Sequence, residues 1–205
     1  MNTRDGGAWF GAALVLLSAA CGSVEVPVET FYRLPAPRPP QSSAPLPAVL
    51  RIDRLHLAAN LAGDQLLVAD GPVRMHRYQL HRWAGPVDEL VSDALLLGLA
   101  RSHGFTEVKG PGDGGAEDLL LSGTIVDFLQ ERRADATVVG RVTLELRLTD
   151  ARSGREVFRA EFSETVPTTD SGPEAAAVAL SAGLGRIVAA VLRRTHAAGV
   201  AARPR

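Results

Sequence analysis

The sequence predicts an α+β fold: a single domain in which an antiparallel or mixed β-sheet carries two main helices packed on one face. Residues 137–149 alternate strictly between apolar and polar side chains, which is typical of a strand with one solvent-exposed face. Two other stretches, which begin at Pro86 and Pro173, carry apolar residues at helical spacing instead. Helices and a sheet of this kind bury their apolar faces against each other, which favours the α+β class.

The N-terminal half begins with a short aromatic-rich strand over Phe31–Leu34. Residues 35–47 hold six of the 13 prolines, so we expect an extended segment without hydrogen-bonded structure, either a spacer or a surface loop. Three strands follow over residues 49–57, 65–68 and 75–80, the last two joined by a turn at Asp70-Gly71-Pro72. The folded core is therefore expected to begin at Val49.

The first helix is expected to start in Arg82-Trp83-Ala84-Gly85-Pro86, because proline suits the first helical position, where a missing N–H costs nothing. Leu96 and Leu99 fall off its apolar stripe. They lie either under a loop or on a second contact face, which would suit self-association. The stripe itself consists of Val87, Leu90, Val91, Ala94 and Leu95.

The C-terminal half is predicted to contain a brief strand over residues 105–108, a flexible loop at Gly110–Gly115, and a central strand over residues 119–129 with apolar residues on both faces. The alternating strand 137–149 then pairs with residues 156–165. The last helix spans residues 173–196, capped by Ser171 or Gly172. One side of this helix is rich in alanine and glycine, which reflects helix propensity or leaves room for a close neighbour; we favour the former.

The segment Ala8–Cys21 predicts export. An apolar run too short to span a bilayer lies between Arg4 and the small residues Ser18-Ala19-Ala20, as in a secretory signal peptide. Cys21, the only cysteine, follows at once, and LSAAC resembles a bacterial lipobox in which the thiol receives diacylglycerol and the new N-terminus an acyl chain. The alternative is an ordinary signal peptide. We interpret the chain as a lipoprotein, because chance is a poor explanation for a sole cysteine at this position. Acyl chains would hold such a protein on a membrane.

Four regions follow from these features. They are a signal peptide (1–20), a segment with lipidated Cys21, a tether, the short strand and the prolines (21–48), the α+β domain (49–198) and a basic tail (199–205). The formal net charge of −1 gives no field that would favour nucleic acid. No second hydrophobic segment appears long and charge-free enough to span a membrane.

Enzyme and metal chemistry find little support in the residues. The five histidines form no pair at metal-ligand spacing and no second cysteine exists, so we expect no metal site and no cofactor beyond the lipid on Cys21. Asp170-Ser171-Gly172 has the letters of an aspartic-protease motif, but a helix cap explains it better. Gly110–Gly115 lacks the lysine and hydroxyl residue of a phosphate-binding loop.

The order of motifs resembles the ABC-type transport auxiliary lipoprotein family. The resemblance rests on the lipobox, the Phe31-Tyr32-Arg33-Leu34 strand, the helix opening Arg82-Trp83-Ala84-x-Pro86, the pattern Leu121-x-Gly123-x-Ile125-x-x-Phe128, the hairpin and the alanine-rich final helix. Members of this family accompany mammalian-cell-entry (MCE) lipid transport systems, including the paraquat-inducible type. The resemblance implies a non-enzymatic envelope lipoprotein that docks with an MCE-domain protein and assists lipid transport between the inner and outer membranes.

By the sorting habit of the family, Gly22 after the lipidated cysteine implies the outer membrane, facing the periplasm. Candidate partner contacts are Phe31, Tyr32, Leu34, Arg82 and Trp83, although packing under the helix start for Trp83 and solvation or pairing for Arg82 are the simpler interpretation. Homo-oligomerisation stays open. The alternatives are a structural lipoprotein of a secretion or lipopolysaccharide-export assembly, and a periplasmic hydrolase with scattered catalytic residues.

Overall fold

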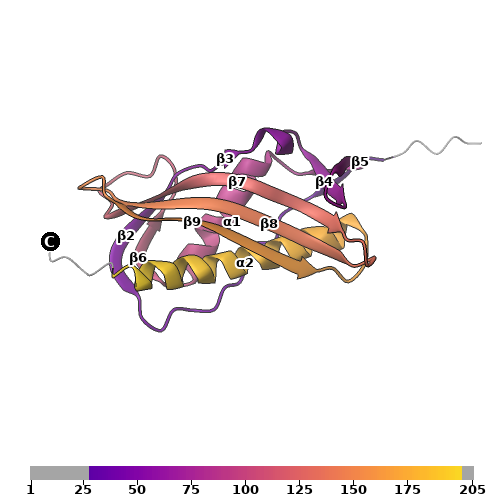
Figure 1. Ribbon diagram of the computed structural model, residues 1–205. Coiled ribbons are helices and arrows are strands. Elements are labelled where there is room, and N and C mark those ends of the chain that lie inside the picture. Colours follow the sequence, from indigo (N-terminus) through magenta and orange to yellow (C-terminus); the bar gives the residue numbers. More distant parts are fainter. Residues whose placement is uncertain (1–27, 200–205) are drawn as a thin grey trace, which may run out of the picture.

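A computed structural model describes residues 28–199 and shows a mixed nine-stranded sheet with two helices, as the sequence predicts. The signal peptide, Cys21 and most of the basic tail lie outside the described residues. Figure 1 shows the long strands β7, β8 and β9 curving together, with α2 lying along them. The element bounds in chain order are β1 Thr30–Tyr32, β2 Leu46–Ile52, β3 His56–Leu57, a 3₁₀ turn Ala59–Leu61, β4 Gln65–Asp70, β5 Arg74–Trp83, α1 Val87–Arg101, β6 Phe105–Lys109, β7 Leu119–Arg132, β8 Val138–Asp150, β9 Glu156–Pro167 and α2 Pro173–Ala197.

Strand β7 organises the sheet. It pairs antiparallel with β8 on one side and parallel with β2, β3 and β4 on the other, and β8 pairs antiparallel with β9. Strand β5 joins β4, β1 joins β5, and β6 joins β2, so β1, β6 and β9 form edges of the sheet. The central position predicted for residues 119–129 is confirmed.

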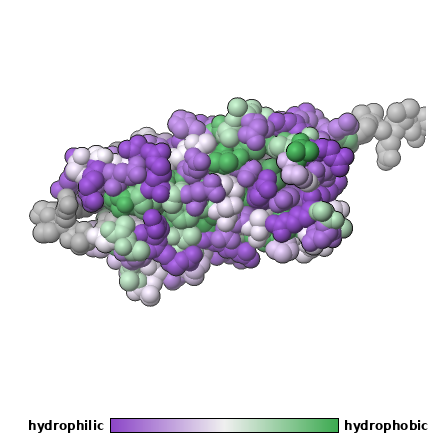
Figure 2. Space-filling model, viewed as in Figure 1, coloured by the Kyte–Doolittle hydropathy of each residue, from purple (hydrophilic) through white to green (hydrophobic). Residues whose placement is uncertain are grey.

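The alternation in β8 has the predicted orientation. Its apolar set faces α2, since Gly140 lies against Ala179 and Val142 against Gly183. The opposite face carries polar side chains, of which Glu145 and Arg147 are exposed. In the view of Figure 2, hydrophilic groups interrupt the apolar surface instead of leaving one continuous apolar face. One wet face and one covered face are what an antiparallel sheet allows.

The core is formed between this sheet face and the two helices. The predicted stripe of α2 is buried, from Ala177 to Val191, and the stripe of α1 is buried apart from half-buried Leu90. By length and composition α2 could cross a membrane, contrary to our reading of the sequence, but most of its apolar window is buried inside the fold. It is the core helix of this domain.

The proline-rich segment differs from the prediction of a spacer or loop outside the core. Strand β2 begins at Leu46 rather than Val49, and Pro37 is buried against Gly98 of α1 and Gly185 of α2. The hydroxyl of Ser181 donates to the carbonyl of Pro35 at 2.7 Å, and the amide of Ser42 donates to the carbonyl of Ser102 at 2.7 Å. The segment is therefore part of the domain, and the small side chains of α2 leave room for it, which is the explanation we had not favoured.

Candidate functional site

Two surfaces of the described residues combine exposure with distinctive chemistry. The first is the outer side of β1 with the residues that hold it, which we call the β1 edge: Val28, Glu29, Phe31, Tyr32 and Arg82. The second is a groove between residues 35–40 and α2, which we call the proline–α2 groove.

The β1 edge presents apolar side chains on a strand that is paired along one side. Phe31 is 59% exposed and Val28 81% exposed. Among the strands of residues 28–199, β1 pairs with β5 alone, in parallel, with Phe31 opposite Arg82. Its outer backbone groups are free for a further strand or an extended peptide, a recurring mode of protein recognition.

Ion pairs hold the β1 edge to the sheet. The Nε atom of Arg82 donates to Glu29 at 2.9 Å, and its Nη1 atom donates to Asp64 at 2.7 Å. The hydrogen bond to Glu29, followed by the one to Asp64, raises the pKa of Arg82 above its ordinary value, so the guanidinium stays charged. Arg82 was considered either as a partner contact or as a solvated or paired side chain, and the structure shows it paired within the chain.

Tyr32 turns inward from the same strand. Its hydroxyl lies 3.0 Å from Nδ1 of His81, and the His81 ring packs edge-on against Tyr78 at a centroid distance of 5.4 Å. Burial, and then the charge of Glu174, raise the pKa of the Tyr32 hydroxyl. Tyr32 thereby fixes the position of β1, which leaves Phe31 as the outward side chain.

The other residues singled out in the sequence lie further inside. Trp83 is 3% exposed and packs against Phe128 with ring centroids 5.3 Å apart, so it cannot contact a partner in this conformation. Leu34 is half-buried against the core. Leu99 is fully buried, which rules it out as a self-association contact, and half-buried Leu96 packs beside Gly110, under the glycine loop.

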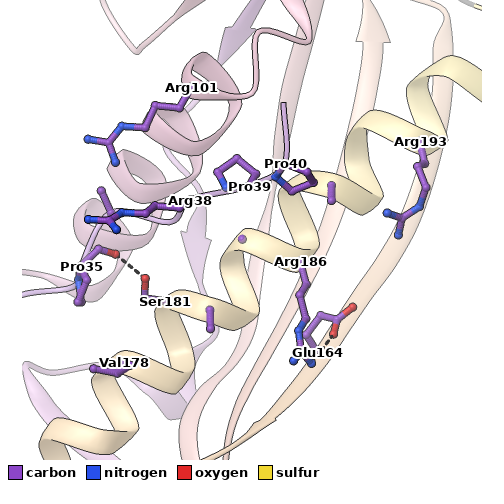
Figure 3. A pocket seen from close by; sticks show the side chains of 14 residues that line it. Pro35, Arg38, Pro39, Pro40, Arg101, Glu164, Val178, Ser181, Arg186 and Arg193 are labelled. Carbon is purple, nitrogen blue, oxygen red and sulfur yellow. Dashed lines mark hydrogen bonds and ion pairs between the residues drawn. The ribbon is translucent and has the colours of Figure 1, made fainter. Parts of the chain in front are cut away.

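The proline–α2 groove has a volume of about 910 Å³ and was not foreseen from the sequence. Small residues of α2 (Ala182, Gly185 and Ala189) line it together with Pro35, Pro39 and Pro40 of the crossing segment. Figure 3 shows arginines on both sides of this lining. The recurrence of Arg186 and Arg193 among alanines and glycines in α2 was the available signal in the sequence. The segment that completes the groove is far away in the chain, since Pro35 and Ser181 are 146 positions apart.

Catalytic groupings are not evident in the described part of the chain. Across residues 28–199 no group of three or more histidine, cysteine or acidic side chains could hold a metal ion. The Asp170 carboxylate accepts a hydrogen bond from the Gly172 N–H at 2.7 Å, in the turn that leads into α2. The protease-like letters therefore serve a local turn, and Gly172 is the N-cap residue of α2.

These features define an α+β domain with an exposed strand edge beside its N-terminal segment and an open groove over its helices. The chain belongs to the family described as the ABC-type transport auxiliary lipoprotein component, whose model matches residues 32–191. The resemblance seen in the sequence is thus confirmed, and a bacterial cell-envelope location follows from the lipoprotein family. No curated protein matches the sequence.

Solved structures share the fold. Protein XCC0632 from Xanthomonas campestris, of the DUF330 family, is 18% identical, with a TM-score of 0.73 over 83% of this chain and 96% of that one. A second structure, of an uncharacterised protein, is 17% identical, with a TM-score of 0.66 over 82% of this chain and 98% of that one. At these identities the similarity concerns the fold alone.

Proposed function

We propose that this protein is a lipid-anchored, periplasm-facing lipoprotein of the outer membrane that docks with an MCE-domain protein of an ABC-type transporter and assists lipid transport between the two membranes. It acts by contact and without covalent chemistry. Family membership supports the auxiliary role in transport. The β1 edge is the observation that carries the docking.

The position of the β1 edge suits a docking surface close to a membrane. Phe31 is ten residues after Cys21, so even a fully extended chain places it within roughly 35 Å of a lipidated cysteine. An exposed aromatic side chain beside an open strand edge offers a hydrophobic anchor together with backbone hydrogen bonds. A protein held at the membrane by acyl chains on Cys21 would thus keep Phe31 close to the membrane surface, on the periplasmic side.

Site-specific photocrosslinking in intact cells tests this proposal. A photoreactive amino acid at Phe31 is expected to capture an MCE-domain protein. The same amino acid at Met75, which is 45% exposed at the opposite end of β5 from the residues that pair with β1, should not. Capture of a secretion or lipopolysaccharide-export component would assign the protein to that machine instead, and capture of neither would remove the docking role of the β1 edge.

The variant Phe31→Asp supplies the quantitative form of the test. Replacing a central aromatic anchor typically costs 2 kcal/mol or more of binding free energy, so recovery of the MCE-domain protein should fall at least about tenfold. The matched control Met75→Asp changes another exposed apolar residue and should leave recovery unchanged. Equal recovery with both variants would contradict the proposal.

A further inference from the structure

We infer that the proline–α2 groove binds one anionic phospholipid, with its phosphate on Arg38 and Arg101 and an acyl chain along the small residues of α2. The inference rests on the proposed function, to which it adds a lipid-binding site on the auxiliary protein itself. The shape and the charge of the groove carry it.

Charge is concentrated in the groove. Its lining contains four arginines (Arg38, Arg101, Arg186 and Arg193) and one carboxylate, Glu164, in a chain whose formal net charge is −1. Glu164 lies 3.7 Å from Arg186, which accounts for one of the four. Among residues 28–199, no acidic side chain forms an ion pair with Arg38, Arg101 or Arg193. A cleft lined by one sign of charge concentrates ligands of the opposite sign.

Two of these three arginines come from different elements and lie on the same rim of the groove. Arg38 lies on the proline-rich segment and Arg101 in the last turn of α1, and Figure 3 shows both side chains extending to the same side of the groove. Guanidinium groups bind phosphate oxygens in a bidentate manner. The ligand that suits a pair of them is a phosphodiester rather than a single carboxylate. This rim is where the headgroup phosphate would bind.

The lining between the rims suits an alkyl chain. Ala182, Gly185 and Ala189 carry no polar side-chain atoms, and Val178, 58% exposed, extends this surface along α2. The prolines that face them have no backbone N–H that would be left without a partner under a hydrocarbon chain. A volume of about 910 Å³ falls within the range of pockets that hold small ligands.

The groove also continues beyond this volume. A neighbouring hollow of about 280 Å³ shares Pro40, Ala189 and Arg193 with it and extends to His196. An elongated apolar surface with cationic rims matches an amphiphile better than a compact anion. The position of Pro35, fourteen residues after Cys21, keeps the groove within reach of a lipid surface.

Photolabelling of the purified full chain tests the inference without any transporter. The probe is phosphatidylglycerol with a diazirine in its acyl chain, added in detergent micelles, and the labelled residues are mapped by mass spectrometry. Labels are expected on α2 between Val178 and Arg193, and the mass of the added lipid distinguishes it from the acyl chains of the protein. Labelling spread evenly over the surface would overturn the proposal.

Arg38→Gln/Arg101→Gln is expected to reduce labelling of α2 at least fivefold. The matched control Arg74→Gln/Arg155→Gln removes two exposed arginines elsewhere on the domain, neither of which forms an ion pair within residues 28–199, and should label like the unchanged protein. A second variant, Ala182→Glu, places a carboxylate on the exposed lining and should also abolish labelling. Equal labelling of the arginine pair variant and its control would overturn the phosphate site.

Competition separates the possible ligands. Unlabelled phosphatidylglycerol should compete, whereas inorganic phosphate at the same concentration should not; full competition by phosphate would show an anion site and overturn the lipid assignment. If Arg38→Gln/Arg101→Gln loses the MCE-domain partner and keeps its labelling, the groove is a protein contact. Because crosslinking at Phe31 is measured separately, failure of the lipid site leaves the test of docking intact.

Discussion

Two side chains fix the backbone of the loop Gly110–Gly115, which the sequence predicts to be flexible. Arg51 donates to the carbonyls of Gly110, Asp113 and Gly115 at 2.8–3.2 Å and pairs with Glu117 at 3.1 Å. Lys109, the only lysine, is 8% exposed and donates to the carbonyls of Gly114 and Ala116. Lys109 therefore has a structural role in this loop, since a buried ammonium requires such hydrogen-bond partners.

Arg51→Ala is expected to lower the free energy of unfolding by about 2 kcal/mol or more, because it removes a half-buried donor that three carbonyls and a carboxylate share. Arg54→Ala is the matched control. Arg54 pairs with Glu89 at 2.6 Å, but both side chains are about half exposed, and such pairs contribute at most about 1 kcal/mol. Urea denaturation of the two variants measures the difference, and equal losses would show that the loop is not held by Arg51.

At the scale of elements, the long hairpin of β7 and β8 sets the curvature against which the helices pack. Gly123 in β7 pairs with Leu146 in β8, and a methyl group added there would meet the carbonyl oxygen of Glu145 and lie 2.8 Å from Cδ2 of Leu146. The glycine that appears in the family-like pattern Leu121-x-Gly123-x-Ile125 therefore permits a close approach between strands.

Gly123→Ala should destabilise the protein by about 1–3 kcal/mol, although alanine is normally better than glycine inside a strand. Gly114→Ala provides the control, because nothing lies within 4 Å of its added carbon and its effect should stay within about 0.5 kcal/mol. Thermal or urea unfolding measures both values. A Gly123→Ala protein as stable as the parent would mean that β7 and β8 can separate without cost.

For the molecule as a whole, each of the two candidate surfaces includes an N-terminal segment that is close in sequence to the predicted lipid. The β1 edge begins at Val28, and the proline–α2 groove is completed by residues 35–40. A lipid on Cys21 would therefore hold both surfaces near a membrane, while the sheet and α2 supply the rigid support.

Cys21→Ser is expected to abolish incorporation of labelled palmitate and to remove the mature protein from the membrane fraction, because the thiol is the acceptor of the diacylglycerol. Ser23→Ala, two positions away, should leave both unchanged. Palmitate labelling followed by membrane fractionation checks the prediction. Labelling that persists in Cys21→Ser would contradict lipidation at this residue.

Much of the fold could be predicted from periodicity, because a period of 2 or 3.6 states which residues share a face. The alternation of β8, the central position of β7 and the buried stripe of α2 all follow from such local patterns. Family membership was likewise apparent from the order of short motifs. The same patterns do not state what covers each face.

The tertiary structure alone decided which candidates face outward. Trp83 and Leu99 are buried because residues from distant parts of the chain cover them, as Phe128 covers Trp83. Phe31 stays exposed. The proline-rich segment looked like a spacer because nothing near it in sequence could pack on it; its partners are α1 and α2, and the bond between Pro35 and Ser181 spans 146 positions. Local sequence sets the faces of each element, whereas burial and grooves arise from contacts between elements, which no local pattern encodes.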